Sequence, residues 1–253
     1  MNLLLFQSHE LDGSGRLELR AGDRRLHHLC TVLKATCGSR VRGGLLNGSR
    51  MQLRLLAEPD IQRSLLLEPE DMEEGAGWSH PRRAVLLAMP RPPALRRILQ
   101  LLPQLGVERL VLAGAARVEK SYFHTPLLVD GEWRGQLMLG MEQARETRLP
   151  EIWLEPRFHL ALASVERWAP AGVARLLPHP GSSMAVAELP PLPGDGWCLA
   201  LGAEGGWLEP EARALGERGF LPVDLGPRIL KVEAALERLA AQLDLLQQMR
   251  RKG

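Results

Sequence analysis

The sequence is poor in cysteine and contains no long apolar run. Its three cysteines, Cys30, Cys37 and Cys198, form no C-x-x-C pair, so their spacing indicates neither a metal site nor a disulfide framework. No stretch approaches the roughly 20 apolar residues that a membrane-spanning helix needs. Residues 1–6 include four apolar residues in a row but lack the basic start and the length of a signal peptide. We therefore expect a cytosolic protein that binds neither a metal nor a membrane.

Several catalytic motifs are also absent. The sequence has no G-x-x-x-x-G-K-[ST] phosphate loop, no H-E-x-x-H and no G-x-S-x-G. Two glycine-rich stretches, GAEGG at 202–206 and GGLLNG at 43–48, do not fit the G-x-G-x-x-G of dinucleotide-binding domains. Phosphate-loop, metalloprotease and hydrolase chemistry therefore have no support. Cys198 lies inside an apolar run, and we interpret it as a core residue rather than a nucleophile.

The composition is that of a soluble globular protein, with 45% apolar and 25% charged residues in a chain of 253. The net charge is only +2, but the charges are unevenly distributed. Basic residues outnumber acidic ones by eight to four in residues 1–50 and by eight to two in residues 81–125, whereas residues 51–80 are acidic by seven to two. The two basic blocks could form a face that binds a polyanion, and the alternative is a set of solvated surface arginines.

The first 70 residues have the pattern of a small β-domain. Asn47-Gly48 between two strand-like runs is a strong hairpin signal. The runs are Arg16 to Arg20, Arg40 to Leu46, Met51 to Ala57 and Ser64 to Leu67. Asp23 is expected to cap a short helix whose apolar face is formed by Leu26, Leu29, Val32 and Leu33. This pattern predicts a barrel of about 70 residues, a size common among RNA-binding modules.

The rest of the chain alternates between strands and helices. Residues 68–80 combine proline, glycine and acid with little periodicity, so we expect an inter-domain linker at 73–81. Beyond it, Pro92-Pro93 is expected to open a helix that Gly106 closes. Further helices are expected at 132–147, around 161–168 and at 228–248. The alternation predicts βαβ units and a mostly parallel sheet, so the chain divides into a barrel at 1–72 and an α/β domain at 82–253.

Two expected strands run directly into glycine. Trp197 to Leu201 is followed by three glycines within five residues, and Leu221 to Leu225 is followed by Gly226. Glycine at the carboxyl end of a strand lets the backbone turn sharply and come close to a ligand. Ligands bind at that end of open α/β sheets. The two strand–glycine–helix units are therefore expected to converge on one pocket.

Charged and polar residues near these glycines are candidates for the chemistry. Glu204 is expected either to orient the loop or a ligand, or to serve only as an acidic helix start. Arg228, Lys231 and Glu233 cluster at the expected start of the last helix, and a solvated helix start is the alternative. His179 follows another expected strand. We expect its backbone to line the pocket, and we do not expect its ring to take part in the chemistry.

Two segments resemble the signature motifs of one family. GAEGGWLEPE at 202–211 is similar to a G-P-E-G-G stretch followed by an acidic helix start, and LGPRILKVEAA at 225–235 is similar to L-G-x-R-I-L-R-x-E-T-A. These are motifs of the SPOUT methyltransferases that methylate N3 of a uridine in 16S ribosomal RNA. Weaker matches to other segments of the family, in the same order along the chain, extend the resemblance over nearly the whole chain. The two motifs together are specific, whereas either alone is not.

The resemblance implies a two-domain protein with a methyl-donor cofactor. Family members carry an N-terminal PUA-like β-barrel that binds RNA and a C-terminal α/β domain with a deep trefoil knot. They act as homodimers on the small ribosomal subunit, without a metal, and hold S-adenosylmethionine through the backbone of three loops in the knot. By matching motif, the residues expected to bind this cofactor are Leu177, His179, Leu201, Gly202, Glu204, Gly205, Leu225, Gly226, Ile229 and Leu230.

The resemblance also implies the chemistry. Methyl transfer requires the uracil N3 to lose its proton and to align with the sulfonium methyl, and positioning supplies much of such a rate. Arg228 or Lys231 is expected to stabilise the developing uracil anion, and Glu233 is a candidate general base. The residues expected to contact RNA are Lys34, Arg40, Arg42, Arg50 and Arg148.

The chain departs from the family's pattern at several positions. Ala203 stands in place of a proline, which loosens the loop but leaves its backbone groups available. Lys231 replaces an arginine and so exchanges a bidentate fork for a point charge. The other replacements are Ala234 for a threonine, Leu101 for a lysine, Glu146 for an arginine and Lys34 for an arginine. The departures keep two alternatives open, namely a non-catalytic RNA-binding or ribosome-assembly protein on the same fold, and a SPOUT enzyme with another RNA target.

Overall fold

The computed structural model describes residues 2–72, 82–169, 171–190, 194 and 196–251. The chain divides into two compact units. The first comprises Met1–Ser79 together with Met138–Leu149, and the second comprises His80–Leu137 and Pro150–Gly253. The expected linker at 73–81 lies outside the described residues. The N-terminal unit thus includes a segment that is distant in the sequence, and no sequence pattern indicates this.

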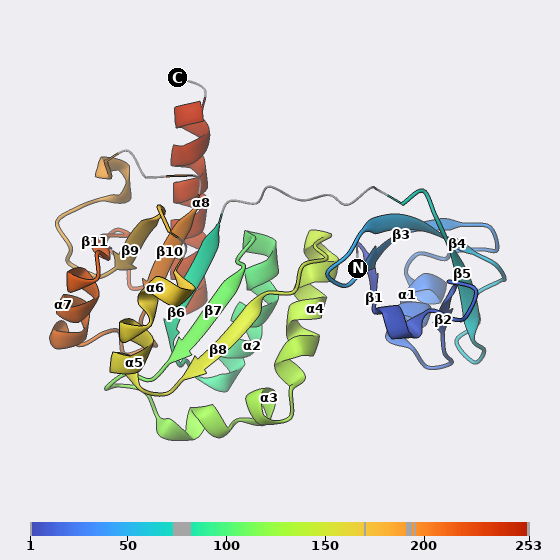
Figure 1. Cartoon of the computed structure of the whole chain (residues 1–253), viewed down its shortest axis with the longest axis horizontal. Coiled ribbons are helices and arrows are strands. Elements are labelled where there is room, and N and C mark those ends of the chain that lie inside the picture. Colours follow the sequence, from blue (N-terminus) through green and yellow to red (C-terminus); the bar gives the residue numbers. More distant parts are fainter. Residues whose placement is uncertain (1, 73–81, 170, 191–193, 195, 252–253) are drawn as a thin grey trace. The chain divides into compact units, whose positions relative to one another are not determined.

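The N-terminal unit is built on a five-stranded, barrel-like sheet (Figure 1). Its elements are β1 (Leu4–Phe6), a 3-10 turn (Ser8–Glu10), β2 (Leu17–Leu19), α1 (Arg24–Thr31), β3 (Arg40–Leu45), β4 (Arg50–Leu55) and β5 (Leu65–Glu70). The strand order is β1-β3-β4-β5-β2, with β1 and β3 parallel and the other neighbours antiparallel. Alternate residues such as Leu53 and Leu55 are fully buried in the core of this sheet.

Local signals explain two features of this unit. The hairpin prediction at Asn47-Gly48 is confirmed, because β3 and β4 pair antiparallel on either side of it and Asn47 adopts a φ of 58°. The capping prediction is also confirmed, because the Asp23 carboxylate accepts a hydrogen bond of 2.7 Å from the backbone N–H of Arg25. Asn47 adopts the left-handed turn conformation and Asp23 caps the helix, which fixes where the chain turns and where α1 begins.

The second unit is an α/β domain around a six-stranded parallel sheet (Figure 1). The strands are β6 (Arg83–Ala88), β7 (Arg109–Ala113), β8 (Glu151–Glu155), β9 (Ala174–Pro178), β10 (Trp197–Leu201) and β11 (Leu221–Val223). Their order is β11-β9-β10-β6-β7-β8, and every neighbouring pair is parallel. This confirms the sheet that the alternating pattern predicts.

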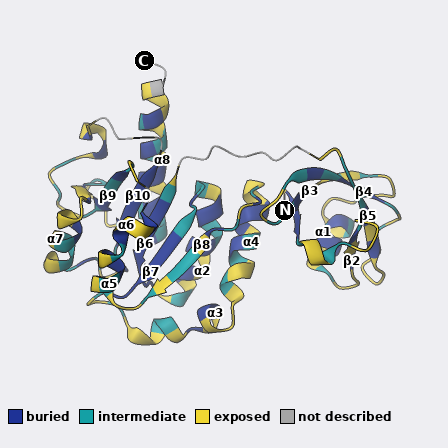
Figure 2. Cartoon of the chain, viewed as in Figure 1, coloured by how far each residue is buried: buried dark blue, intermediate teal, exposed yellow. Residues whose placement is uncertain are grey.

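Helices cover both faces of this sheet. They are α2 (Pro92–Leu101), α3 (Pro126–Val129), α4 (Glu132–Ala144), α5 (Phe158–Ala163), α6 (Val165–Trp168), α7 (Glu209–Glu217) and α8 (Val232–Arg251), with 3-10 turns at Leu102–Leu105, Lys120–His124 and Val186–Glu188. Trp168 and Phe220 join one buried cluster with Leu86 and Cys198 on one face, while α2 and α8 contact each other on the other. Figure 2 shows the buried strands and the exposed outer faces of the helices. Among the described residues, no helix has both the length and the apolarity needed to cross a membrane.

Several helix boundaries differ from the sequence predictions, and the helix expected around 161–168 is divided into α5 and α6. The helix α1 ends at Thr31, so Val32 and Leu33 are not part of its apolar face and are 64% and 48% exposed. The helix α4 ends at Ala144 rather than at residue 147, because Arg145 adopts the left-handed conformation with a φ of 59°. The helix α8 begins at Val232, four residues later than expected. Apolar spacing therefore locates these helices but not their ends.

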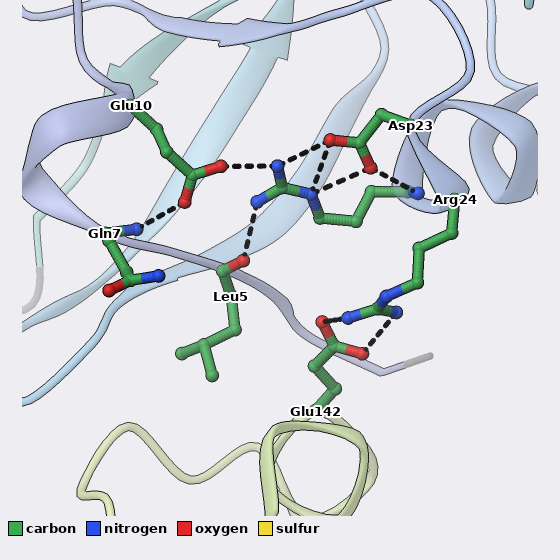
Figure 3. A network of polar contacts seen from close by, with 7 residues as sticks. Leu5, Gln7, Glu10, Asp23, Arg24 and Glu142 are labelled. Carbon is green, nitrogen blue, oxygen red and sulfur yellow. Dashed lines mark hydrogen bonds and ion pairs between the residues drawn. The ribbon is translucent and has the colours of Figure 1, made fainter. Parts of the chain in front are cut away.

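The N-terminal unit buries a charged network around Arg25 (Figure 3). The Arg25 side chain is only 10% exposed, and its guanidinium contacts Glu10 and Asp23 at 2.5 and 2.6 Å. It also donates a hydrogen bond of 2.9 Å to the carbonyl of Leu5 in β1. Burial opposes the charge on Arg25, but the two carboxylates outweigh it and raise the arginine pKa. For Asp23, burial is likewise outweighed, and the hydrogen bonds from Arg25 lower the carboxyl pKa. The network ties α1 to β1.

A second ion pair holds the segment Met138–Leu149 in the same unit (Figure 3). Glu142 of α4 has a side chain that is only 2% exposed, and it accepts hydrogen bonds of 2.8 and 2.5 Å from the two terminal nitrogens of Arg24. Further along the segment, the carbonyl of Thr147 accepts a 2.7 Å hydrogen bond from the backbone N–H of Asn47 in the hairpin turn. Met141 adds an apolar contact, since it is buried together with Leu3 and Leu5.

We expect Arg25→Met to destabilise the N-terminal unit by about 3–5 kcal/mol, because it leaves Glu10 and Asp23 as largely buried carboxylates without a cation. The matched control is Arg16→Met. Arg16 is 42% exposed and shares Glu68 with Arg54, so its removal is expected to cost less than about 1 kcal/mol. Urea unfolding measures both costs, and hydrogen exchange of the β4 amides assigns them to this unit. Equal losses in the two variants would contradict the prediction.

Candidate active site

A pocket of about 580 Å³ lies at the carboxyl ends of β9, β10 and β11. It is lined by Pro178 to Pro180, Leu201 to Trp207, Asp224 to Gly226, Arg228 to Val232, Ala235 and Arg117. Its volume lies within the range of roughly 300–1,000 Å³ that is typical of small-molecule sites. Its place at the carboxyl ends of parallel strands is the one where open α/β sheets bind ligands. The strands β10 and β11 therefore meet at one pocket, although β11 ends at Val223 and not at Leu225 as predicted.

The loop after β10 folds back on itself so closely that it requires glycine. A Cβ atom at Gly202 would lie 2.8 Å from the Cα of Gly206 and 2.9 Å from the backbone nitrogen of Trp207. Gly206 has a φ of 67°, and its N–H donates a 2.8 Å hydrogen bond to the carbonyl of Ala203. Trp207 then anchors the loop, because it is buried with its ring centroid 5.3 Å from that of Phe158. The loop shape is thus fixed by backbone contact and by one buried indole.

The first turn of α7 connects this loop to the loop after β7. The helix begins at Glu209 with Pro210 in its first turn. The carboxylate of Glu211 accepts one 2.8 Å hydrogen bond from the backbone N–H of Leu208 and another from that of Ala116. An acid in the first turn both caps the helix and binds a neighbouring loop. One carboxylate therefore braces two walls of the pocket.

Glu204 lies in the pocket wall but not at the start of a helix. Its side chain is exposed, and its carboxylate accepts a 3.2 Å hydrogen bond from the backbone N–H of Arg91. Arg91 is the N-cap residue of α2, where the first helical N–H groups lack intrahelical partners. Because α7 begins only at Glu209, this contact favours the loop-orienting interpretation of Glu204.

The loop after β11 forms the opposite wall of the pocket. Gly226 has a φ of 98°, which favours glycine, and its N–H donates a 3.1 Å hydrogen bond to the carboxylate of Asp224. Arg228 and Lys231 were expected to lie in the first turn of the last helix. This expectation is wrong, because α8 begins at Val232 and both residues belong to the preceding loop. They reach the same pocket through the loop instead.

The two cations of this loop are available to a ligand. Arg228 and Lys231 are both exposed and both line the pocket. Among the described residues, neither side chain makes an ion pair or a hydrogen bond. The candidate base Glu233 is differently placed, because it is outside the lining and accepts hydrogen bonds of 3.0 and 2.8 Å from Arg97. Burial raises the pKa of Glu233, but its own backbone N–H and Arg97 outweigh burial and lower the pKa. A carboxylate held in this way is a weaker proton acceptor.

The structure brings most of the expected cofactor-binding residues together. Nine of the ten line the pocket. The exception is Leu177, which is 2% exposed and packs in the core beside the pocket. His179 takes its position from its backbone, whose N–H donates a 3.0 Å hydrogen bond to the carbonyl of Val223. Ile229 is an apolar side chain that is 85% exposed at the pocket.

Sequence reasoning missed Arg117, which also lines the pocket. It follows β7, and its guanidinium donates a hydrogen bond to the carbonyl of Gly205 in the glycine loop. The only available signal was its place just beyond the carboxyl end of an expected strand.

Metal ligation is a separate question. In the part of the chain that the structure describes, no three histidine, cysteine or acidic residues are grouped to hold a metal ion.

The five residues expected to contact RNA all belong to the N-terminal unit. On β3, Arg40 and Arg42 point away from the core, because they alternate with Val41, which packs against it. Arg40 is partly neutralised by Glu70 at 2.9 Å, whereas Arg42 is exposed and makes no ion pair with a described residue. The other three divide into Lys34 and Arg148, which are exposed, and Arg50, which is half-buried.

Comparison with known proteins decides the family. A sequence model of the RNA methyltransferase domain matches residues 79–243. The ribosomal RNA small subunit methyltransferase E of Treponema pallidum (strain Nichols) is 30% identical over 244 residues, which cover 93% of this chain and 87% of that protein. The chain belongs to the ribosomal RNA small subunit methyltransferase E family. A member of this family is an RNA methyltransferase, so the loops and the cations described above surround its candidate active site.

Two solved structures share the fold. The ribosomal RNA small subunit methyltransferase E of Neisseria gonorrhoeae, crystallised with S-adenosyl methionine, matches with a TM-score of 0.71 at 20% identity over 98% of both chains. A methyltransferase of Legionella pneumophila, also in complex with this cofactor, matches with a TM-score of 0.72 at 20% identity over 98% of this chain and 97% of that one. The SPOUT methyltransferase fold with its parallel sheet, together with the barrel-like sheet, is therefore common to these proteins.

Proposed function

We propose that this RNA methyltransferase transfers the methyl group of S-adenosylmethionine to N3 of a uridine in the 16S ribosomal RNA of the small ribosomal subunit. The observation that carries the proposal is the pocket, in which both family motifs meet beside two exposed cations. The relative from Treponema pallidum is named for small-subunit ribosomal RNA. Two proteins of the same fold hold the cofactor in their crystals. These relatives support both the substrate class and the methyl donor.

The pocket fits S-adenosylmethionine. Gly202 and Gly226 leave out side chains where the walls come together, because a Cβ at Gly202 would strike the backbone and Gly226 has a positive φ. Main-chain N–H and C=O groups are thereby free to approach the edge of an adenine, while Leu201 and Leu230 supply apolar surface. We propose that the residues holding the cofactor are His179, Leu201, Gly202, Glu204, Gly205, Leu225, Gly226, Ile229 and Leu230, with Leu177 supporting them from the core.

The residues of the chain then determine the chemistry at the bound base. The cofactor supplies, when bound, a methyl group on a sulfonium that a nucleophile can attack. A uracil that loses its N3 proton to water at this exposed site carries negative charge shared with its two carbonyl oxygens, and transfer of the methyl group to N3 leaves S-adenosylhomocysteine. Arg228 and Lys231 stabilise this charge from the loop after β11. Glu233 is held by Arg97 and positions the start of α8, so it does not accept the N3 proton in this proposal.

The finer features of the family belong to the same proposal. We propose that the loops around the pocket form a deep trefoil knot and that the barrel-like unit is a PUA-like RNA-binding domain. The three converging loops support the first, and the outward arginines of β3 support the second. We propose further that the protein is a homodimer in the cytoplasm. Ile229, exposed beside the pocket, supports a partner that covers it, and a ribosomal substrate supports the location.

Methyl transfer to small ribosomal subunits that lack the modification tests the function. The subunits are incubated with the protein and labelled S-adenosylmethionine, and the RNA is digested to nucleosides for mass spectrometry. We expect label in N3-methyluridine. Label in another nucleoside would refute the N3 assignment, and cofactor binding without any transfer to these subunits would show that the protein acts on a different RNA.

Gly202→Ala is expected to weaken S-adenosylmethionine binding by at least about tenfold, because the added Cβ forces the loop away from Gly206 and so alters the adenosyl site. The control is Gly216→Ala in α7, where an added Cβ meets no atom within 4 Å. Calorimetric titration measures both affinities, and circular dichroism verifies that both variants are folded. A folded Gly202→Ala protein with unchanged affinity would refute the assignment of this pocket.

Arg42→Glu is expected to weaken binding to small ribosomal subunits by about tenfold at low salt and by less at high salt, because a phosphate contact becomes a repulsion. Affinity for S-adenosylmethionine is expected to stay unchanged. Arg63→Glu is the control, since Arg63 lies in the same unit, is 86% exposed and is not an expected RNA contact. If both reversals weaken binding equally at every salt concentration, the basic face of β3 has no specific role.

A further inference from the structure

We propose that Arg117 binds a phosphate of the RNA strand next to the target base and so positions that base at the pocket. The inference rests on the proposed function and adds a residue that neither family motif contains. Arg117 lies in the loop after β7, and it is the pocket's third cation beside Arg228 and Lys231 among the described residues. A phosphate-binding side chain fixes the register of a nucleic acid without reading its sequence.

The first step of the argument is that Arg117 is held at the pocket. Its guanidinium donates a hydrogen bond to the carbonyl of Gly205. Its aliphatic part lies against the same residue, since a Cβ built on Gly205 would be 3.0 Å from the Cδ and 3.1 Å from the Cβ of Arg117. The preceding residue, Ala116, is fixed by the hydrogen bond of its N–H to Glu211 at 2.8 Å. A long and flexible side chain is therefore confined to one place.

The second step is that most of its donors remain available. A guanidinium has five N–H donors in a planar fork that matches the oxygens of a phosphate. Within the described part of the chain, Arg117 makes one hydrogen bond, to Gly205, and no ion pair with a carboxylate. The side chain is exposed. These donors distinguish it from Arg97, whose guanidinium is paired with the carboxylate of Glu233.

The third step concerns charge. Arg117, Arg228 and Lys231 surround a pocket whose two acids, Glu204 and Asp224, already accept backbone N–H groups. S-adenosylmethionine carries a sulfonium and an ammonium against one carboxylate, so an excess of cations does not match its overall charge. An RNA strand carries a negative charge at every nucleotide, and arginine binds phosphate through paired hydrogen bonds. The cations at this pocket therefore match the substrate rather than the cofactor.

The fourth step is the arrangement of the cations. In the sheet, β7 and β11 are separated by β9, β10 and β6, so the loops that follow them approach the pocket from different sides. The glycine loop after β10 lies between them, with Gly205 against Arg117. A strand bound at Arg117 can thus extend over the glycine loop and bring its base to Arg228 and Lys231. Arg117 is thus assigned to the phosphate, and Arg228 and Lys231 are assigned to the uracil anion.

The experiment compares Arg117→Ala, Arg117→Lys and the control Arg213→Ala in the full chain. Arg213 is 70% exposed on α7 and does not line the pocket. The affinity for small ribosomal subunits is measured across a series of salt concentrations, and the affinity for S-adenosylmethionine is measured separately. For Arg117→Ala we expect about tenfold weaker RNA binding at low salt, with a salt slope that is smaller by about one, and a smaller loss of cofactor affinity. Arg117→Lys should retain the salt slope, and Arg213→Ala should resemble the unaltered protein.

Two results would overturn the proposal. A loss of cofactor affinity in both Arg117 variants, without a change in salt slope, would make Arg117 a brace of the glycine loop. A variant that binds S-adenosylhomocysteine poorly but 5′-methylthioadenosine normally would show that Arg117 holds the cofactor's carboxylate instead of a phosphate. Neither readout depends on turnover. If the unaltered protein bound the subunits but transferred no methyl group, the proposed function would fail while the salt slopes still tested Arg117.

Discussion

The candidate site depends on one close approach of the backbone to itself. At the end of β10, Gly202 lies so near Gly206 and the nitrogen of Trp207 that only a hydrogen atom fits between them. This contact determines the direction in which the chain leaves the sheet, and burial of the Trp207 indole prevents the loop from opening. The neighbouring segments of the pocket are held in place by contacts with this loop. Glu211 connects it to the loop after β7, Glu204 connects it to α2, and Arg117 packs against it.

Charge is used differently in the two units. In the N-terminal unit the buried ions are neutralised, with Arg25 between two acids and Glu142 against Arg24. Such pairs specify a geometry more than they stabilise it, because desolvation offsets most of their attraction. At the pocket of the second unit, Arg228 and Lys231 remain exposed. Unpaired surface cations cost little in water and bind strongly once a polyanion displaces its counterions.

The sequence predicts most of the fold because its signals are local. Asn47-Gly48, Asp23 and Pro92-Pro93 each set the backbone conformation of the few residues around them, and all three predictions are confirmed. The glycines after β10 and β11 correctly indicate the pocket, since the turns that they permit depend only on the backbone around them. The remainder depends on contacts between distant segments. Nothing near Arg117 in the sequence shows that Gly205 lies beside it. The apolar period that predicts α8 also continues through residues 228–231, which belong to the pocket loop instead.

The segment Met138–Leu149 has a consequence for how the protein is made. It supplies Met141 to a cluster with Leu3 and Leu5, and Glu142 to Arg24, so the N-terminal unit is incomplete without it. Residues 82–137 are synthesised between the two parts of that unit. The barrel-like sheet therefore cannot complete its packing as the first domain to leave the ribosome, although domains commonly fold in that order. Its last contacts form only after β6 and β7 have emerged, so an apparently N-terminal domain finishes folding together with its neighbour.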